Sequence, residues 1–375
     1  MKKSRILFST CLVLSSLLLA CYKNHKMAEF HELNGRGYYS CNLDNSEIPV
    51  SELKLSSIVE EPKFILFDDS PESLFGFWRC AISDNYIGMC TPHNRFQMFD
   101  HNGRYIRSIG NIGHGPGEYI NIYGACIDEK NGFVYLADMM TRRLSKYTLE
   151  GVFVGWLNDR PFSKTVLRCD KTGALQVVNI PFAPDDVQFM IAPLNTTPKY
   201  YQAALDVPTR DKDGNFTGFN NEIWAYNNTS ELSYQISCSD TLYAFNYTDS
   251  INYPLITAKA EGKYPFYNDI NEYFLVSVYD EQTPDEIYWI KKKNGEITRG
   301  KMINDYLFGM PVKNATFCFK DGWYYQFFES FDLESQLKDL LKEGKLSQLE
   351  QTKVRELIEK ARNANQGMML LGRIK

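Results

Sequence analysis

Acidic and histidine side chains are the groups in this sequence that could carry out acid–base or metal chemistry. Asp68 with Asp69, or Asp185 with Asp186, could act as carboxylates in hydrolysis, although adjacent acids on loops are usually just solvated. Residues 211–215, Asp-Lys-Asp-Gly-Asn, resemble part of a calcium loop but lack its distal Glu, and a solvated hairpin turn is the simpler interpretation. The five histidines show no paired ligand spacing: His25, His31, His93, His101 and His114. With no Gly-x-Ser-x-Gly turn either, the sequence predicts no catalytic residue, no metal site and no cofactor.

A glycine-rich stretch at residues 110–117 invites comparison with the loops that bind phosphate. Such loops follow a strand, precede a helix and, in the common form, end in Gly-Lys-Ser or Gly-Lys-Thr. Here an apolar strand follows the glycines, and no Lys-Ser or Lys-Thr pair closes the stretch. We therefore interpret Gly113, Gly115 and Gly117 as part of a connection between two sheets, where glycine permits close backbone approach.

The N-terminus carries the signs of an export signal. Lys2, Lys3 and Arg5 precede an uncharged and mainly apolar run at residues 6–20. This run of about 15 residues is shorter than the roughly 20 that a membrane-spanning helix needs. A basic start followed by a short apolar run is typical of a secretory signal peptide.

Residues 18–21, Leu-Leu-Ala-Cys, resemble the lipobox of bacterial lipoproteins, in which the cysteine receives diacylglycerol. The resemblance implies cleavage after residues 1–20 and a lipid anchor on Cys21, which two or three acyl chains make effectively permanent. An ordinary secretory signal that happens to end in cysteine is the alternative. Lys23 and Lys26 follow without an acidic run, which favours an outer membrane location facing the periplasm.

Composition narrows the class of partner. The net charge of −5 argues against nucleic acid, which needs a strongly basic surface. The 24 Tyr and 24 Phe favour strands and can also supply contact surface for a ligand. Two aromatic clusters contain the candidate ligand-contacting residues: Trp224, Tyr226, Tyr264 and Tyr267.

Cysteine usage leaves two interpretations open for one pair. Of nine cysteines, Cys11 leaves with the signal and Cys21 is the lipid acceptor, so an odd number remains and a complete disulfide framework is not expected. Cys80 and Cys90 flank the turn at residues 83–85 and could face each other across a hairpin. They are either a disulfide in an oxidising compartment or two small buried residues.

The elements that must position these residues are short strands. From about residue 64 to residue 327, alternating or apolar runs are broken by turns such as residues 171–173, 293–295 and 320–322, each ending in glycine. Glycine there permits the positive φ of tight hairpins. Because no long helix lies between the runs, the pattern predicts an all-β sandwich, barrel or propeller.

An internal repeat distinguishes among these three architectures. Five positions recur 48 residues further along the chain: Arg95, Phe96, Phe99, Gly103 and Tyr105 match Arg143, Leu144, Tyr147, Gly151 and Phe153. A period of about 40–50 residues is typical of a propeller blade, and roughly 300 residues of β-rich chain then give about six blades. Within the second copy, Asp138 could pair with Arg143 across a turn and pin the blade. The first copy has Cys90 where the second has Asp138.

The C-terminal part has a helical pattern. Asp332 can cap a first helix that stops near Gly344, and Ser347 with Glu350 can form the capping box of a second helix. We expect this helical hairpin to span residues 332–365. A closing strand at residues 368–374 should follow and pair the two ends of the ring.

The repeat also resembles a known family. Residues 109–119, Ile-Gly-Asn-Ile-Gly-His-Gly-Pro-Gly-Glu-Tyr, include Glu118 and lead to a strand ending in Ala-Asp and to Arg-Leu-Ser-Lys-Tyr at residues 143–147. This resembles the NHL repeat and, more specifically, is similar to six-bladed β-propeller lipoproteins of gram-negative gut bacteria over about residues 64–157. The resemblance implies a six-bladed propeller in the cell envelope. It implies no reaction, because that family has no settled activity.

We therefore divide the chain into a signal peptide (1–20), a lipidated tether leading into the first strand (21–55) and a propeller (56–375). The leading hypothesis is a membrane-anchored binding or scaffold module for an envelope protein, peptide or glycan. The alternative is a hydrolase or lyase that uses the central channel, and a third possibility is a structural protein without a small ligand. Convergence of acids, histidines or a metal at the channel mouth would favour the enzyme.

Overall fold

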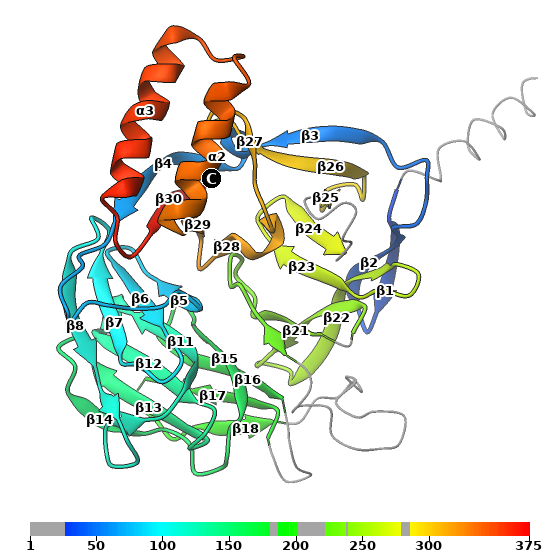
Figure 1. Cartoon of the computed structure of the whole chain (residues 1–375). Coiled ribbons are helices and arrows are strands. Elements are labelled where there is room, and N and C mark those ends of the chain that lie inside the picture. The colour runs from blue at the N-terminus through cyan, green and yellow to red at the C-terminus, as the bar shows by residue number, and fades with distance from the viewer. Residues whose placement is uncertain (1–26, 181–186, 195, 202–221, 238, 279–285) are drawn as a thin grey trace, which may run out of the picture.

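The chain folds into a ring of six β-sheets around a central axis, as a computed structural model shows (Figure 1). The structure describes residues 27–180, 187–194, 196–201, 222–237, 239–278 and 286–375. The prediction of a six-bladed β-propeller with two helices before the last strand is confirmed. Among the described residues, no helix is long and apolar enough to cross a membrane.

The first five blades each contain four antiparallel strands that are consecutive in the chain and run from the channel outward. Blades 1 to 3 consist of β5 (Arg79–Ile82), β6 (Tyr86–Cys90), β7 (Phe96–Asp100) and β8 (Tyr105–Ile109); β11 (Ile122–Asp128), β12 (Phe133–Asp138), β13 (Arg143–Thr148) and β14 (Phe153–Trp156); and β15 (Lys164–Cys169), β16 (Leu175–Ile180), β17 (Phe189–Ala192) and β18 (Lys199–Tyr201). Blades 4 and 5 consist of β19 (Ile223–Trp224), β20 (Ser233–Ile236), β21 (Thr241–Asn246) and β22 (Ile251–Lys259); and β23 (Pro265–Asp269), β24 (Tyr273–Val278), β25 (Glu286–Lys291) and β26 (Ile297–Asn304).

The sixth blade joins the two ends of the propeller. It consists of β28 (Phe319–Lys320), β29 (Trp323–Phe328) and β30 (Met368–Ile374), followed on the outside by β4 (Val59–Leu66) from the other end of the chain. Strand β30 pairs with both β29 and β4. The predicted closing strand therefore hydrogen-bonds the C-terminal part of the ring to its beginning, which removes two open sheet edges.

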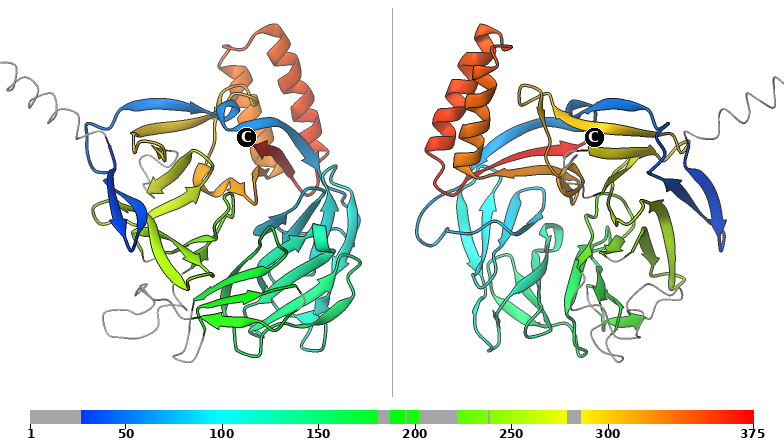
Figure 2. Two further views of the ribbon diagram at one scale, coloured as in Figure 1. Left: turned by 180° about the vertical axis from the view of Figure 1, so that it is seen from behind. Right: turned by 45° about the vertical axis from the view of Figure 1, so that its right-hand side comes forward.

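Two helices are inserted between β29 and β30. Helices α2 (Ser330–Lys342) and α3 (Gln348–Arg362) stand beside blade 6 (Figure 2), and their apolar faces pack against its core. The Ser347–Glu350 capping box is present. The predicted cap at Asp332 is wrong, because α2 begins two residues earlier and Asp332 lies in its first turn. Its negative charge there still interacts favourably with the positive end of the helix dipole.

The N-terminal segment differs from the expected tether. Strands β1 (Glu29–Leu33) and β2 (Arg36–Asn42) form a hairpin, and β2 pairs in parallel with β22 at the edge of blade 4. Strand β3 (Val50–Lys54) pairs in parallel with β26 of blade 5. These strands extend the outer sides of blades 4 and 5. Their side chains are mostly exposed or half-buried, so they lack the apolar pattern that marks the other strands.

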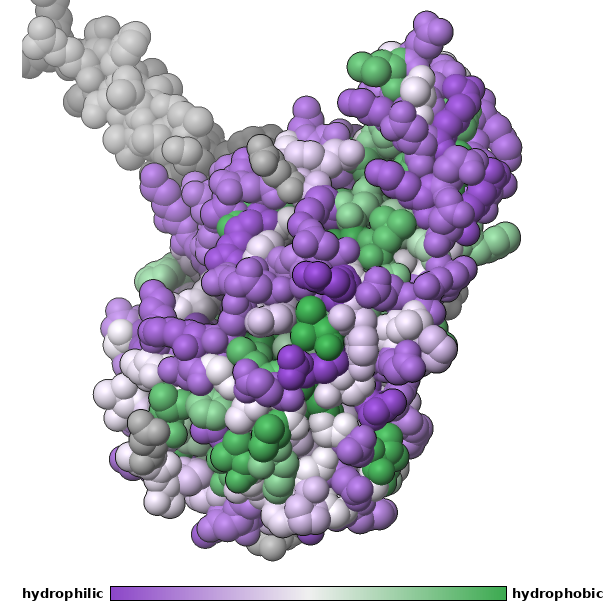
Figure 3. All heavy atoms as spheres, turned by 90° about the vertical axis from the view of Figure 1, so that its left-hand side faces the viewer, coloured by the Kyte–Doolittle hydropathy of each residue, from purple (hydrophilic) through white to green (hydrophobic). Residues whose placement is uncertain are grey.

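The remaining short elements lie between or beside the blades. They are the strands β9 (Asn111–Ile112), β10 (Glu118–Tyr119) and β27 (Met310–Pro311), and the 3-10 turns η2 (Leu55–Ser57), η3 (Glu129–Asn131) and η4 (Ala315–Phe317). On the outer face over β8 and β14, small groups of hydrophobic side chains lie among polar ones (Figure 3). The exposed ones on and beside β14 are Val152, Val154 and Trp156.

The internal repeat corresponds to equivalent hairpins in blades 1 and 2. Gly103 lies between β7 and β8, Gly151 lies between β13 and β14, and both have positive φ, +82° and +88°. A Cβ on Gly103 would also approach the carbonyl oxygen of Leu66 to 1.8 Å. Glycine at this turn therefore lets β4 pass close to blade 1, in addition to permitting the turn itself.

Candidate functional site

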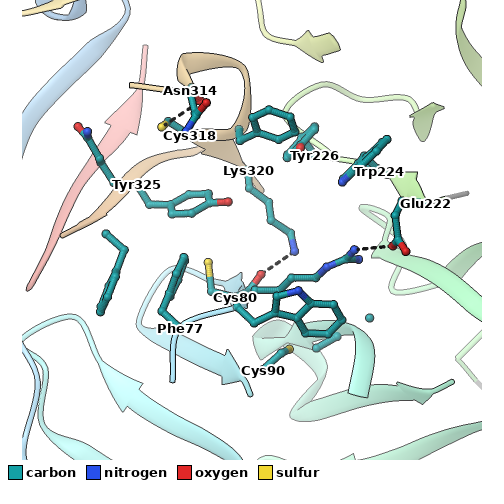
Figure 4. A pocket seen from close by; sticks show the side chains of 18 of the residues that line it. Phe77, Cys80, Cys90, Glu222, Trp224, Tyr226, Asn314, Cys318, Lys320 and Tyr325 are labelled. Carbon is teal, nitrogen blue, oxygen red and sulfur yellow. Dashed lines mark hydrogen bonds and ion pairs between the residues drawn. The ribbon is translucent and has the colours of Figure 1, made fainter. Parts of the chain in front are cut away.

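A cavity of about 700 Å³ occupies the central channel (Figure 4). Its walls come from the inner strands β5, β11, β15 and β19, from residues 313–320, from β29 and from the first turns of α2. The volume falls within the range of roughly 300–1,000 Å³ that is common for small-ligand sites. The propeller thus brings together side chains that are far apart in sequence.

A charged cluster lies on the side of the cavity formed by blades 1 to 4. The Glu222 carboxylate is 2.7 Å from Lys164 Nζ through one oxygen and 3.2 Å from an Arg79 nitrogen through the other. Tyr123 donates its hydroxyl hydrogen to Glu222 as well. The Arg79 guanidinium also lies over two rings, 4.6 Å from the Trp78 centroid and 4.0 Å from that of Tyr123. These contacts hold both the carboxylate and the guanidinium in fixed positions.

The cluster keeps Glu222 ionised. Partial burial raises the pKa of Glu222, but hydrogen bonds from Lys164 and Tyr123 and the charges of Lys164 and Arg79 outweigh it, so the pKa lies below its ordinary value. The opposite holds for the Tyr123 phenol, where burial is the main cause that raises the pKa to about 12. At neutral pH the charged cluster therefore consists of one carboxylate, two cations and a neutral phenol.

Replacing Glu222 by Gln should destabilise the protein by about 2 kcal/mol at pH 7, because its ion pairs with Arg79 and with Lys164, only 7 % exposed, would be lost. We place the effect below that of a fully buried pair because the Glu222 side chain is 38 % exposed. Since the folded-state pKa is lowered, the contribution is present above the ordinary value of 4.5 and is lost as the pH falls through the lowered pKa. Urea unfolding at several pH values would measure both effects.

The matched control is Asp84→Asn, which breaks a pair with Arg373 whose two side chains are 73 % and 49 % exposed. This variant should change stability by less than about 0.5 kcal/mol. A Glu222→Gln protein as stable as the control at pH 7 would contradict the structural role of the charged cluster.

Aromatic rings form much of the remaining wall. Figure 4 shows Phe77, Trp224, Tyr226 and Tyr325 arranged around Lys320, whose side chain reaches toward the middle of the cavity. Phe77 stacks on Phe327 with a centroid separation of 4.5 Å. Trp224 packs edge-on against Phe266 and Phe317, which fixes its orientation. Trp78 also lines the cavity and keeps 37 % of its surface exposed.

Polar atoms on the wall could bind a ligand. Lys320 Nζ donates to the carbonyl oxygen of Cys80 at 2.6 Å, which leaves further N–H donors on this ammonium. Within the described part of the chain, the buried Tyr226 hydroxyl has no hydrogen-bond partner. Burial raises the pKa of Tyr226, so its hydroxyl stays neutral. A buried hydroxyl without a partner on a cavity wall is a natural contact for a polar ligand or water.

The structure decides between the two interpretations of Cys80 and Cys90. Both thiols are free and buried. In the β5–β6 hairpin, Cys80 lies opposite Met89 and Cys90 lies opposite Arg79, so the two cysteines are not cross-strand partners. Burial raises the pKa of Cys80 to about 12 and that of Cys90 to about 11, which keeps both thiols protonated and unreactive at neutral pH.

The four aromatic residues predicted to contact a ligand separate into three groups. Trp224 and Tyr226 line the cavity. Tyr264 is 56 % exposed and is not among the residues that line the cavity. Tyr267 is not a surface residue, because its ring is buried and its hydroxyl donates to the Asp240 carbonyl and accepts from the Ala258 amide. The strand pattern of residues 264–267 gave no means of telling which ring points inward.

The glycine-rich stretch connects blades 1 and 2, between β8 and β11. The Glu118 carboxylate accepts a hydrogen bond from the Gly115 amide at 2.8 Å, and a Cβ on Gly113 would approach that carboxylate to 2.2 Å. Gly117 adopts a φ of +77°. Because the protein's own carboxylate occupies the turn, a phosphate would meet a negative charge there.

Asp138 and Arg143 are cross-strand partners but do not form the predicted ion pair. The buried Asp138 carboxylate instead accepts hydrogen bonds from the amides of Ile120, Asn121 and Met140 and from the Thr141 hydroxyl. These donors satisfy the carboxylate without a cation. The Arg143 guanidinium lies over the Trp156 ring at 4.1 Å, whereas Arg95 is exposed just before β7.

Of the acidic pairs considered for hydrolysis, the described one, Asp68 and Asp69, does not line the cavity. Asp68 accepts a hydrogen bond from the amide of Tyr105 at the start of β8, and Asp69 accepts one from Asn365 in the loop before β30. Residues 185–186, residues 211–215 and Cys21 lie outside the described residues. Among the residues that are described, no group of three His, Cys, Asp or Glu is placed to hold a metal ion.

Sequence reasoning did not find the charged cluster. Arg79, Tyr123, Lys164 and Glu222 come from blades 1, 2, 3 and 4, and each stands alone in its own sequence neighbourhood. The one local signal was Phe-Trp-Arg at residues 77–79, where a cation follows two aromatic residues.

The sheets and the cavity together define a class: a six-bladed β-propeller with a ligand-sized cavity in its channel. Residues 40–371 match the family described as "Domain of unknown function (DUF4934)", and the chain belongs to this family. No curated protein matches the sequence.

One solved structure supports the fold. The chain is similar to a Bacteroides fragilis protein provisionally assigned as exported, with a TM-score of 0.59, 14 % identity and coverage of 90 % of this chain and 99 % of that one. It is also 12 % identical to a member of the DUF4221 family from Bacteroides vulgatus, over 72 % of this chain and 75 % of that one, with a TM-score of 0.37. The likeness to the Bacteroides fragilis protein concerns the fold alone.

Proposed function

We propose that this protein is a lipid-anchored binding protein of the cell envelope that holds a saccharide in its central cavity. The observation that carries the proposal is the cavity itself, in which aromatic rings stand beside fixed charges. Trp78, Trp224 and Phe317 offer flat apolar faces, while Arg79, Glu222 and Lys320 offer donors and an acceptor. Sugars combine apolar C–H faces with hydroxyl groups that both donate and accept hydrogen bonds, so this mixture suits them.

The shape of the site favours a compact ligand over a long peptide. The cavity lies inside the ring of inner strands, and α2 contributes Asp332 and Gln336 to its rim. A peptide that adds a strand must lie along an open sheet edge, and the open edges of these inner strands face the central cavity rather than the outer surface. A short saccharide or the end of a longer glycan fits the volume and the polarity.

The charged cluster argues against the hydrolase or lyase alternative. Both Glu222 oxygens are held by Lys164, Arg79 and Tyr123, which stabilises the ionised form and leaves it poorly suited to proton transfer. Glu329 and Asp332 also line the cavity, but they lie at the start of α2 beside blade 6, whereas Glu222 lies beside β19 of blade 4. A pair of carboxyls working on one glycosidic bond must both reach it.

The test is a parallel screen of the protein lacking residues 1–21. Saccharides and peptides are titrated for binding, and the same compounds are incubated with the protein and examined for products. The proposal expects saccharide binding without turnover. Turnover that one Asp, Glu or His substitution abolishes, while folding stays intact, would favour the enzyme. Selective binding of peptides would show that the ligand is a peptide and not a saccharide.

Export and anchoring are proposed from the N-terminal residues and are consistent with the provisional assignment of the Bacteroides fragilis protein as exported. Cys21→Ser removes the acceptor sulfur, so we expect the variant to leave the membrane fraction, because one or more buried acyl chains supply the attachment. Cell fractionation with immunodetection measures this, and Cys41→Ser serves as a control that should remain attached. Unchanged membrane association of the Cys21→Ser protein would contradict the anchor.

A further inference from the structure

Two thiols meet between blades 2 and 3. Cys126 lies on β11 and Cys169 is the last residue of β15, and these are the inner strands of neighbouring blades. The two Sγ atoms are 3.4 Å apart, although the residues are separated by 43 positions in the chain. Both cysteines are half-buried rather than enclosed in the core.

We infer that Cys126 and Cys169 form a disulfide that links blades 2 and 3. The Sγ atoms must approach from 3.4 Å to the S–S bond length of about 2.05 Å, a gap that a small rotation of each side chain can close. The two strands are already in close contact, since a Cβ on Gly124 of β11 would approach the carbonyl oxygen of Thr165 on β15 to 2.2 Å. The inference depends on the proposed export only for access to an oxidising compartment.

The reaction is a thiol–disulfide exchange with a disulfide donor, either a small disulfide or a disulfide-carrying protein. The thiolate of one cysteine attacks the donor and forms a mixed disulfide, releasing one donor thiol. The second cysteine then attacks the protein sulfur of that bond and releases the other donor thiol. The protein loses two hydrogen atoms and two electrons pass to the donor, so no further reactant is needed.

The other described cysteines provide an internal contrast. Cys80, Cys90 and Cys318 are buried, and Cys318 directs its sulfur toward the carbonyl oxygens of Lys313 and Asn314. Cys41 lies on β2 at the edge of blade 4, away from blades 2 and 3. Among the described cysteines, Cys126 and Cys169 alone have their sulfur atoms within contact distance. Oxidation should therefore be selective.

The bond would fasten the ring beside the cavity. β11 supplies Tyr123 and β15 supplies Lys164 to the charged cluster, and a link between these strands restrains both. Cross-linking two positions far apart in sequence also reduces the freedom of the unfolded chain. We expect the oxidised protein to melt about 5 °C above the reduced protein.

The test uses the purified full-length chain, first reduced and then incubated with glutathione disulfide. After acid quenching, denaturation and alkylation of free thiols, the digested protein is analysed by mass spectrometry. The expected result is a linked peptide pair containing Cys126 and Cys169, with the other free thiols, including those of Cys41, Cys80, Cys90 and Cys318, alkylated. Recovery of both Cys126 and Cys169 as alkylated peptides, or their linkage to other cysteines, would overturn the inference.

Two variants show whether the thermal effect comes from this bond. Cys126→Ala and Cys169→Ala should each melt at one temperature with or without oxidation, whereas Cys80→Ser should keep the difference between the two states. If one alanine variant fails to fold, the other provides the same comparison. An oxidation-dependent shift that persists in either alanine variant would contradict the assignment.

Discussion

Removing residues 367–375 should abolish stable folding. The deletion takes away β30, which pairs with β29 on one side and with β4 on the other. Four consecutive side chains of this strand, Met368 to Leu371, are at most 2 % exposed. Burying each contributes about 1.5–3 kcal/mol, so their loss is of the same order as the roughly 5–15 kcal/mol that stabilises a typical folded protein. Expression of the truncated chain should give aggregated protein without a cooperative melting transition.

Two point substitutions in β30 show whether the truncated protein is unstable because the ring cannot close, or because any change near the C-terminus destabilises the fold. Leu371→Asp places a charge in the core between blades 6 and 1 and should lower the melting temperature by many degrees. Arg373→Asp changes a half-exposed residue of the same strand and should have a much smaller effect. A truncated protein that melts like the full chain would show that the ring closes elsewhere.

The second large effect concerns binding. Trp78→Ala and Trp224→Ala should each weaken saccharide affinity about 30-fold, which corresponds to about 2 kcal/mol for the loss of an aromatic contact in a largely desolvated site. Trp78 lies on the blade 1 side of the cavity and Trp224 on the blade 4 side, so the two changes remove different walls. Isothermal titration with a saccharide found in the screen measures both.

Tyr264→Ala is the matched control for the two tryptophan variants. Tyr264 is an exposed aromatic residue that the sequence also marked as a candidate contact, but it does not belong to the described lining of the cavity. Its removal should leave the affinity unchanged within about twofold. Equal losses in all three variants would mean that the ligand does not depend on the cavity.

Local patterns were sufficient to predict the architecture. The 48-residue repeat that pairs Gly103 with Gly151 indicated a propeller because the same turn is needed in each blade. The capping box at Ser347 marked the second inserted helix, and the apolar run after Gly367 marked the closing strand. Each of these signals depends on residues close together in the chain, where spacing reports directly on secondary structure.

The site could be predicted only in part, because its residues meet through the closure of the ring. Trp224 and Tyr226 stood out as an aromatic cluster, whereas the ion pairs of Glu222 join residues 58 and 143 positions away. Tyr267 was predicted to contact a ligand but is buried, since an aromatic residue in a strand can face either the core or a ligand. The Cys126–Cys169 contact likewise depends on how two blades are placed side by side.

The most direct test of the central claim is a crystal structure of the protein in complex with the saccharide that binds most tightly in the screen. The account predicts a saccharide inside the channel, stacked on Trp78 or Trp224, with its hydroxyl groups within hydrogen-bonding distance of Lys320, Tyr226 or the Arg79–Glu222 pair. A saccharide bound on the outside of the blades, with the central cavity holding only water, would contradict it.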